Sequence, residues 1–383
     1  MKAKVLAVAL AGLLLAGCSS GGGGDPLTRL SEAPPQPGGG KPGASTSAEP
    51  EVVKVKQPWQ PGMRQYGIAI YWENNDDDTD QIVRAKAQKV LDHAVELGAN
   101  SVSFSFSFVM DSAYANAVRT DDPITPPPSR LEIALDEANK RGLRTVVRPM
   151  LHERNLTKDD PDMWRGSIRP ENRTKWFASY LDLLLGYAKV AERSKAATFV
   201  VGTELNSMEA STTGWKTVAA GIKEVYSGEV EYSANYDKLR ESGPAPGIGL
   251  SVDAYPPLEL GDSASVSRIV AGWNDWLDDN RGDGPITDLV LAEVAIGARS
   301  GAYQEPWSPH AKGSIKPEIQ QRWFDAACEV MRERDLGGIY FWMINMDVDP
   351  KAKPSSKSPM DFLGRPGEQN IARCFAKDPK RAS

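Results

Sequence analysis

The chain has 383 residues, of which 40% are hydrophobic and 25% charged, and its formal net charge is −6 at pH 7. This length fits one large domain or two small ones, and the acidic balance argues against a nucleic-acid-binding surface. With only three His and three Cys, and no close His/Cys/Asp spacing, the sequence predicts neither a transition-metal site nor a cofactor.

The chain begins with a pattern typical of secretion. Lys2 and Lys4 precede an apolar run, residues 5–16, that is too short to span a bilayer. The run leads into Leu-Ala-Gly-Cys18, which resembles a bacterial lipobox, where the cysteine is diacylated and becomes the mature N-terminus. We expect a signal peptide over residues 1–17 and a protein held at the outer side of the cell membrane by lipid on Cys18. The alternative is an ordinary secretory peptide with an incidental cysteine.

Residues 18–58 are rich in Gly, Pro, Ser and Ala and contain almost no large apolar side chains. Such a segment cannot bury enough surface to offset its ordering entropy, so it reads as a flexible tether. Residues 59–378 then form the predicted folded domain, which we expect to be monomeric. No later apolar run approaches the length that spans a bilayer, so only the lipid would hold the protein to the membrane.

From residue 66 onward, short apolar runs alternate with amphipathic segments. Eight runs are rich in β-branched and aromatic residues and predict strands. They are Tyr66–Trp72, Ser101–Phe108, Leu143–Leu151, Ala197–Leu205, Glu229–Asn235, Ile248–Tyr255, Leu289–Ile296 and Gly338–Met346.

The segments between these runs carry helix signals. Helical periodicity covers Thr79–Leu97, Asn172–Arg193 and Pro317–Arg334, and Ser129-x-x-Glu132 is a capping box for a helix that ends at Gly142. Strands joined by helical crossovers predict an α/β protein, a (β/α)₈ TIM barrel. Only about a dozen residues, rich in Gly and Pro, separate the fifth and sixth runs, so the fifth helix should be reduced. The competing open sheet would require a Gly-rich phosphate turn, which is absent.

Two glutamates stand where predicted strands end: Glu204 closes the fourth run and Glu293 the seventh. Catalytic residues of such barrels come from the carboxyl ends of strands. Ionised carboxylates are rarely buried without a reason, and two of them suggest the acid/base and nucleophile of a glycosidase. The alternative for each is a salt-bridge partner or a residue near a helix cap.

Several stretches are similar to glycoside hydrolase family 113, a family of retaining barrel glycosidases whose best-known activity is β-mannanase. The similarity covers roughly residues 66–375. The stretches are Phe-Val-Val-Gly-Thr-Glu-Leu205, Gly-Glu-Val-Glu-Tyr-Ser-Ala-Asn235, Ser-Val-Asp-Ala-Tyr-Pro-Pro-Leu258, Trp164-Arg-Gly and Trp176-Phe-x-x-Tyr180.

The resemblance implies that Glu204 is the general acid/base and Glu293 the nucleophile. It also implies that Tyr255 hydrogen-bonds the nucleophile and that Trp342 forms the aromatic floor of the central sugar subsite. The chain departs from the pattern at Thr203, where many relatives have the Asn that holds the sugar 2-OH. The residues around the nucleophile, Ala-Glu-Val, also differ from the more typical Thr-Glu-Ile/Gly-Tyr.

Further polar and aromatic side chains lie at predicted strand ends. Arg148 could hold Glu293 as a carboxylate, and the alternative is a structural ion pair in the barrel mouth. Sugars have flat apolar faces edged with hydroxyls, so Trp72, His152 and Asn235 are candidate substrate contacts. Each of these three could equally be a packing residue. Trp307, in the loop after the seventh strand, is a candidate for an outer subsite.

The sequence thus predicts a retaining glycoside hydrolase acting on a β-linked polysaccharide or oligosaccharide, with mannan as one candidate and a cell-envelope glycan as another. The alternative is a non-catalytic carbohydrate-binding or envelope-scaffold lipoprotein, which the presence of both glutamates disfavours. Cys328 and Cys374 could form a disulfide outside the cytoplasm or remain two buried thiols, and the sequence leaves both open.

Overall fold

The computed structural model describes residues 52–158, 160–239, 243–281, 286–308, 313–354 and 360–381. The predicted signal peptide, Cys18 and most of the predicted tether lie outside these residues. Among the residues described, no helix combines the length and the apolar character needed to cross a membrane.

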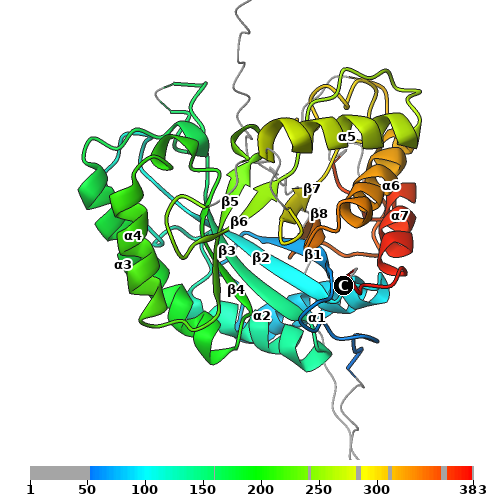
Figure 1. Cartoon of the computed structure of the whole chain (residues 1–383). Coiled ribbons are helices and arrows are strands. Elements are labelled where there is room, and N and C mark those ends of the chain that lie inside the picture. The colour runs from blue at the N-terminus through cyan, green and yellow to red at the C-terminus, as the bar shows by residue number, and fades with distance from the viewer. Residues whose placement is uncertain are drawn as a thin grey trace, which may run out of the picture.

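The predicted (β/α)₈ barrel is confirmed. Eight parallel strands pair in chain order and close on one another, with helices outside them (Figure 1). The strands are β1 Gln65–Trp72, β2 Ser101–Phe108, β3 Arg144–Leu151, β4 Thr198–Thr203, β5 Glu229–Asn235, β6 Gly249–Asp253, β7 Val290–Val294 and β8 Gly338–Asn345. The α-helices are α1 Asp80–Glu96, α2 Pro128–Arg141, α3 Arg173–Arg193, α4 Thr212–Lys223, α5 Val266–Arg281, α6 Pro317–Glu333 and α7 Pro366–Phe375.

The sequence of β2, Ser-Val-Ser-Phe-Ser-Phe-Ser-Phe, shows how alternation divides the core into two parts. Phe106 and Phe108 point outward, and their rings lie 5.0 and 5.2 Å from the ring of Tyr187 on α3. Ser105 points into the barrel, where its Oγ lies 3.5 Å from an Arg148 nitrogen. Side chains alternate along a strand, so the same strand packs helices outside and polar groups inside.

Three helices begin as the sequence predicts, α1 with Thr79 as its cap among them, and one does not. The side chain of Asn172 accepts a hydrogen bond from the Lys175 N–H at the start of α3, and Pro317 is the first residue of α6. The capping box expected at Ser129 is absent, because α2 begins at Pro128 with Pro127 in the cap position and no side-chain cap bond. A proline at the first helical position has no N–H to satisfy, so the helix starts two residues earlier than predicted.

The fifth helix is reduced, as expected. Within the described residues between β5 and β6, the helical segment is the single 3₁₀ turn η3, Tyr236–Lys238. Two further 3₁₀ turns, η1 Arg165–Ser167 and η2 Asn206–Met208, lie in the loops after β3 and β4.

Both ends of the described chain meet at the N-terminal end of the barrel. Met63 and Lys380 form an antiparallel bridge, and the Arg64 N–H donates to the Pro379 carbonyl at 2.6 Å. The Val55 N–H donates to the Arg141 carbonyl at 2.9 Å, and its side chain packs on the core. The folded body therefore starts before the predicted boundary at residue 59 and continues past residue 378, since Val55 supplies apolar surface within the predicted tether.

Cys328 of α6 and Cys374 of α7 form a disulfide, with Cα atoms 5.9 Å apart and a sequence separation of 46. The sequence left open whether these cysteines are bonded or are two buried thiols, and the structure shows the disulfide.

Candidate active site

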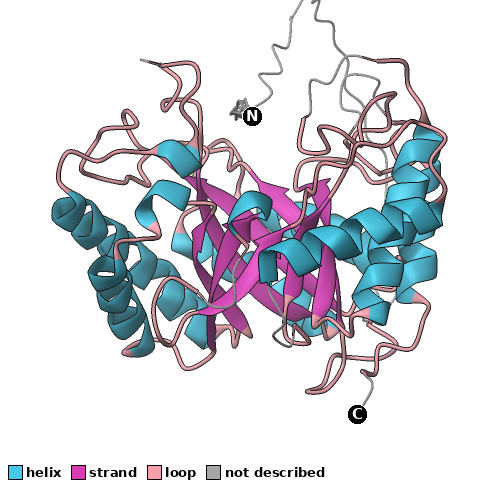
Figure 2. Cartoon of the chain, turned by 45° about the horizontal axis from the view of Figure 1, so that its top comes forward, coloured by secondary structure: helices cyan, strands magenta, loops and turns pink. Residues whose placement is uncertain are grey.

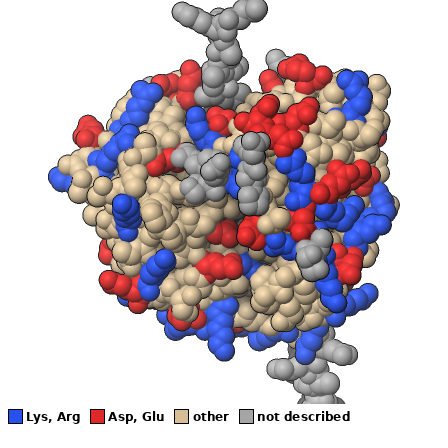
Figure 3. Space-filling view, viewed as in Figure 1, with Lys and Arg blue, Asp and Glu red and all other residues tan. Residues whose placement is uncertain are grey.

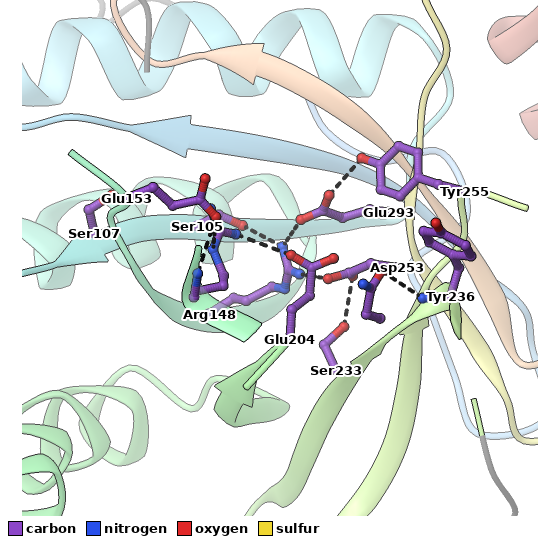
Figure 4. A network of polar contacts seen from close by, with 12 residues as sticks. Ser105, Ser107, Arg148, Glu153, Glu204, Ser233, Tyr236, Asp253, Tyr255 and Glu293 are labelled. Atoms are coloured by element: carbon purple, nitrogen blue, oxygen red, sulfur yellow. Dashed lines mark hydrogen bonds and ion pairs between the residues drawn. The ribbon is translucent and has the colours of Figure 1, made fainter. Parts of the chain in front are cut away.

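Four charged side chains from four strands converge at the carboxyl end of the barrel. Arg148 comes from β3, Glu204 directly follows β4, Asp253 ends β6, and Glu293 lies in β7. The arrowheads of the strands mark this end in Figure 2, and Figure 4 shows the four side chains directed toward one another. The two glutamates that the sequence singled out therefore share one site.

Arg148 is the centre of this site. Its guanidinium pairs through one nitrogen with Glu293 and through the other with Asp253, at 2.7 Å from Oδ2. Arg148 and Asp253 are 1% and 0% exposed. Buried charges require partners, and here one guanidinium serves two carboxylates. The predicted contact between Arg148 and Glu293 is present.

Glu293 has a second donor. The Tyr255 hydroxyl donates to Glu293 Oε2 at 2.7 Å, as the sequence predicted for this tyrosine. A guanidinium and a phenol both donate, so the arrangement suits an ionised carboxylate, which only accepts hydrogen bonds.

Glu204 has an unusual backbone conformation. Its φ is +54°, in the left-handed region that L-residues avoid. The other described non-glycine residues with positive φ are Lys195 and Asp335, and each lies two residues beyond the end of a helix, where this conformation is common. Glu204 instead follows a strand with an irregular register, and its N–H donates to the Ser233 carbonyl at 2.8 Å. Such conformations cost about 1–3 kcal/mol and cluster at functional sites.

Burial and nearby charge set the electrostatics of Glu204. Burial raises its pKa well above the usual range, and the charges of Asp253 and Glu293 add to this. Arg165 opposes the shift, with a nitrogen 3.4 Å from Glu204 Oε2. Glu204 is therefore suited to carry a proton at neutral pH.

Asp253 is also perturbed. Burial raises its pKa to about 7, although the Arg148 charge and the hydrogen bond from the Ser233 hydroxyl, 2.8 Å from Oδ1, favour the ionised form. Three carboxyl groups thus share the space around Arg148.

Arg165 comes from η1, in the loop after β3. Its Nε lies 3.2 Å from Glu153 Oε1, and its side chain is 8% exposed. Arg165 therefore links Glu153, at the mouth of β3, to Glu204.

Aromatic rings line the same end of the barrel. Trp342 of β8 packs with Tyr255, and its ring lies 5.7 Å from the Arg148 guanidinium carbon and 5.7 Å from the ring of Tyr71. Tyr236 and Trp307 form a second, partly buried pair, stacked with 5.1 Å between ring centroids and 11° between planes. Aromatic faces next to carboxylates can bind the apolar faces of sugars.

The three remaining predicted contacts differ in their placement. His152 lies at the mouth, where its Nδ1 accepts from the Arg154 N–H at 3.0 Å and its Nε2 is 3.5 Å from Glu73. Asn235 ends β5, and its side chain accepts from the Tyr236 N–H at 2.8 Å. Both belong to the site region.

Trp72 does not face the site, so the prediction was wrong for this residue. It is 2% exposed and packs in the main hydrophobic cluster with Ile68 and Ile70 of the same strand. Alternation along β1 turns the neighbouring Tyr71 toward the mouth, where its hydroxyl lies 3.1 Å from Ser107 Oγ and 3.3 Å from Glu73.

Sequence reasoning missed several residues of the site. Two had a usable signal: Asp253 ends the sixth strand two residues before Tyr255, and Arg165 lies within the Trp-Arg-Gly stretch noted above. Glu153 and Glu73 follow strand ends but carry no distinguishing pattern.

The described residues contain no group of three or more His, Cys, Asp or Glu arranged to hold a metal ion. The face of the molecule seen in Figure 3 carries acidic and basic side chains side by side. The site itself brings together carboxyl groups in contrasting environments, Glu293 bound by two donors and Glu204 with a raised pKa.

A comparison with protein families identifies the family of this chain, and comparisons with solved structures show the same fold. The family model of Glycoside Hydrolase Family 113 matches residues 76–365. A GH113 β-mannanase, AaManA from Alicyclobacillus acidocaldarius in complex with ManMIm, superposes with a TM-score of 0.65 at 22% identity, over 82% of this chain and 97% of that one. Another GH113 β-1,4-mannanase gives 0.65 at 20% identity, over 82% and 98%.

A more distant structure has the same fold. A glycoside hydrolase family 5 protein from Streptomyces cattleya, in complex with Manβ1-4GlcNAc, gives a TM-score of 0.51 at 14% identity, over 82% of this chain and 83% of that one. At these identities the structural likeness shows the fold. A comparison with curated proteins finds no match.

Proposed function

The chain belongs to glycoside hydrolase family 113, and from this premise we propose that Glu204 is the acid/base and Glu293 the nucleophile of a retaining β-glycosidase. The observation that carries the assignment is the contrast between the two carboxyl groups. Glu293 accepts hydrogen bonds from Arg148 and Tyr255, whereas burial and two neighbouring carboxylates raise the pKa of Glu204. One ionised and one protonated carboxyl is what a retaining mechanism requires.

In the first step, a Glu293 oxygen attacks the anomeric carbon as the glycosidic C–O bond breaks, and Glu204 gives its proton to the leaving oxygen. In the second step, Glu204 takes a proton from water, the water oxygen attacks the anomeric carbon, and the ester bond to Glu293 breaks. Both carboxyl groups thereby return to their starting states.

The proposed substrate is a β-1,4-linked mannan or its oligosaccharides. Support comes from the aromatic rings of Trp342, Tyr71 and the Tyr236–Trp307 pair, and from the β-mannanase activity in the names of the two family 113 structures. His152 and Asn235 supply polar groups that could bind sugar hydroxyls at the mouth. Thr203 stands where many relatives have the Asn that holds the sugar 2-OH, so this chain lacks that amide.

A non-catalytic scaffold is not favoured. A protein that only bound carbohydrate would have no need to bury two carboxyl groups, Asp253 and Glu293, around one guanidinium. It would also have no need for the left-handed backbone at Glu204.

Paired alanine substitutions test the two catalytic roles. Glu293→Ala should abolish turnover of every substrate. Glu204→Ala should retain activity on aryl glycosides with activated leaving groups, which need little protonation, and azide should partly restore its turnover. Glu132→Ala, which removes a partly exposed carboxylate paired with Arg193 on the helical surface, is the control. Equal loss in both active-site variants on activated substrates, without rescue, would contradict the assignment.

The substrate proposal is tested by hydrolysis of a panel of mannans, glucans, xylans and envelope glycans. We expect mannan to be cleaved with the highest kcat/KM. If another member of the panel is cleaved in preference to mannan, the proposed substrate is wrong. The proposed roles of Glu204 and Glu293 would not be affected.

We propose that the mature protein is a monomer anchored at the outer side of the cell membrane by lipid on Cys18. The lipobox-like sequence supports this, although Cys18 lies outside the described residues. Two acyl chains anchor stably, so the protein should stay with membranes after a salt wash and enter the detergent phase. Cys18→Ser should release it, and Ser20→Ala should not. Wild-type protein wholly in the soluble fraction would refute the anchor.

A further inference from the structure

Asp253 is a third buried carboxyl group for which the two-glutamate mechanism has no use. It is 0% exposed, and its two oxygens are occupied by Arg148, at 2.7 Å, and by the Ser233 hydroxyl, at 2.8 Å. Asp253 and Glu293 are also directly paired in register on adjacent strands. The position of Asp253 is therefore fixed by the barrel itself.

The charge around Arg148 changes during the proposed cycle. When Glu293 becomes an ester, it loses its negative charge and its salt bridge to Arg148. Figure 4 shows Glu204 on the same side of the site as this guanidinium, and Glu204 must then act as a free base. An unanchored guanidinium would be drawn to that carboxylate and would weaken it as a base. Asp253 is the other carboxylate bonded to Arg148 among the described residues.

We propose that Asp253 is a positioning residue that anchors Arg148 while Glu293 is esterified, and so keeps Glu204 available to take a proton from water. The proposal rests on the proposed roles of Glu204 and Glu293. Asp253 does not touch the reacting atoms in this scheme, and its effect passes through Arg148 and through its own charge.

The charged groups around the two carboxyls support this reading. The charged groups that act on Glu204 are Asp253, Arg165, Glu293 and Arg148. Among them, Asp253 raises the pKa of Glu204 most. Those acting on Asp253 are Arg148, Glu293 and Arg165, together with the hydrogen bond from Ser233. In its ionised form, which the Arg148 charge and the hydrogen bond from Ser233 favour, Asp253 therefore favours the protonated acid in the first step and the strong base in the second.

Asp253→Asn tests the proposal because it keeps the shape of the side chain and removes the charge. Glu204 loses a negative neighbour, so the alkaline limb of kcat/KM on substrates with poor leaving groups should move to lower pH by about one unit. With an activated aryl glycoside, hydrolysis of the ester should become rate-limiting. We expect kcat to fall about tenfold, KM to fall with it, and a burst of released aryl alcohol.

Two further variants separate charge from packing. Ser105→Ala removes a neutral contact with the same guanidinium, so its alkaline limb should stay at the wild-type pH. Ser233→Ala removes a hydrogen bond that favours the ionised form of Asp253, so it should shift the limb in the same direction as Asp253→Asn, by less. This variant keeps the test decisive if Asp253→Asn fails to fold.

An unmoved alkaline limb in both Asp253→Asn and Ser233→Ala, with activity lowered evenly across pH, would overturn the proposal and reduce Asp253 to a structural role. The proposed function fails separately, if Glu204→Ala and Glu293→Ala lose activity alike on activated substrates without azide rescue.

Discussion

Arg148 binds two buried carboxylates, Asp253 and Glu293, with one positive charge, so the negative charge at the site is not fully balanced. The raised pKa values of Glu204 and Asp253 express this imbalance. When a carboxyl group whose pKa is raised on folding ionises, the free energy of unfolding decreases. At the scale of single residues, the site therefore gives up stability to keep a proton on Glu204.

The pH dependence of stability follows from Asp253. Its pKa is 3.8 in the unfolded reference and about 7 in the folded protein, so between these values the folded state binds more protons. Its contribution is therefore present below about pH 4 and is lost as the pH rises to about 7. Asp253→Asn cannot ionise, so its unfolding free energy relative to wild type should increase over this range. Denaturant titrations at pH 4 and pH 7.5 measure the difference, and a relative stability that is constant or falls with pH would contradict it.

The sequence predicted four site residues well for a common reason. Glu204, Glu293, Arg148 and Tyr255 carry polar groups that are costly to bury, and all of them except Arg148, which lies within β3, stand at or near the end of a strand. Asp253 meets both criteria, but it went unnoticed because a single Asp after a short strand is ordinary until a partner is known.

The prediction that Trp72 contacts the substrate was wrong for a different reason. Side chains alternate along a strand, so an error of one position moves a side chain from the barrel interior to the face that packs against the helices. Tyr71 is the residue that faces Trp342, and the sequence alone does not fix which of two adjacent aromatics points inward.

At the scale of elements, strand positions followed from composition, whereas their ends depended on tertiary contacts. The predicted fourth and sixth strands ran two residues past the observed ends at Thr203 and Asp253. In each case one of the two extra residues, Glu204 or Tyr255, belongs to the site, and the other packs in the main hydrophobic cluster. The start of a helix was predictable where a side chain caps it, as at α3. The prediction was wrong at α2, where no side chain does so. At α2 the Pro127 carbonyl accepts from the Arg130 and Leu131 N–H groups.

The cap of α3 gives a test at this scale. Asn172 accepts from the Lys175 N–H at 3.0 Å, so Asn172→Ala should lower the free energy of unfolding by about 1 kcal/mol. Asn172→Asp keeps an acceptor at the helix N-terminus and should remain within about 0.5 kcal/mol of wild type. Chemical denaturation measures both. Equal losses in the two variants would show that the cap bond is not the cause.

At the scale of the whole molecule, the barrel order was predictable because eight apolar runs alternate with helical segments, and the closure places the fourth and seventh strand ends at one mouth. The domain ends were less predictable. Val55 and Lys380 contact the folded domain through backbone hydrogen bonds, and Val55 also through packing. No local sequence pattern predicts these contacts.

The disulfide between Cys328 and Cys374 should stabilise the whole domain through the unfolded chain. It closes a loop with a sequence separation of 46, for which chain-entropy reasoning gives about 4 kcal/mol. Replacing both cysteines with serine should lower the melting temperature, and a reducing agent should lower that of wild type but not of the double variant. A reducing agent without effect on wild type would indicate that the bond contributes little.

Both ends of the described chain lie at the end of the barrel opposite the site, because Met63 pairs with Lys380 just before the start of β1, whereas the strand arrowheads in Figure 2 mark the other end. A bead, surface or fusion partner attached through either end would therefore sit behind the enzyme. The mouth would face outward, toward the surrounding medium. Immobilised in this way, the protein could work on a large insoluble polymer without its support blocking the approach.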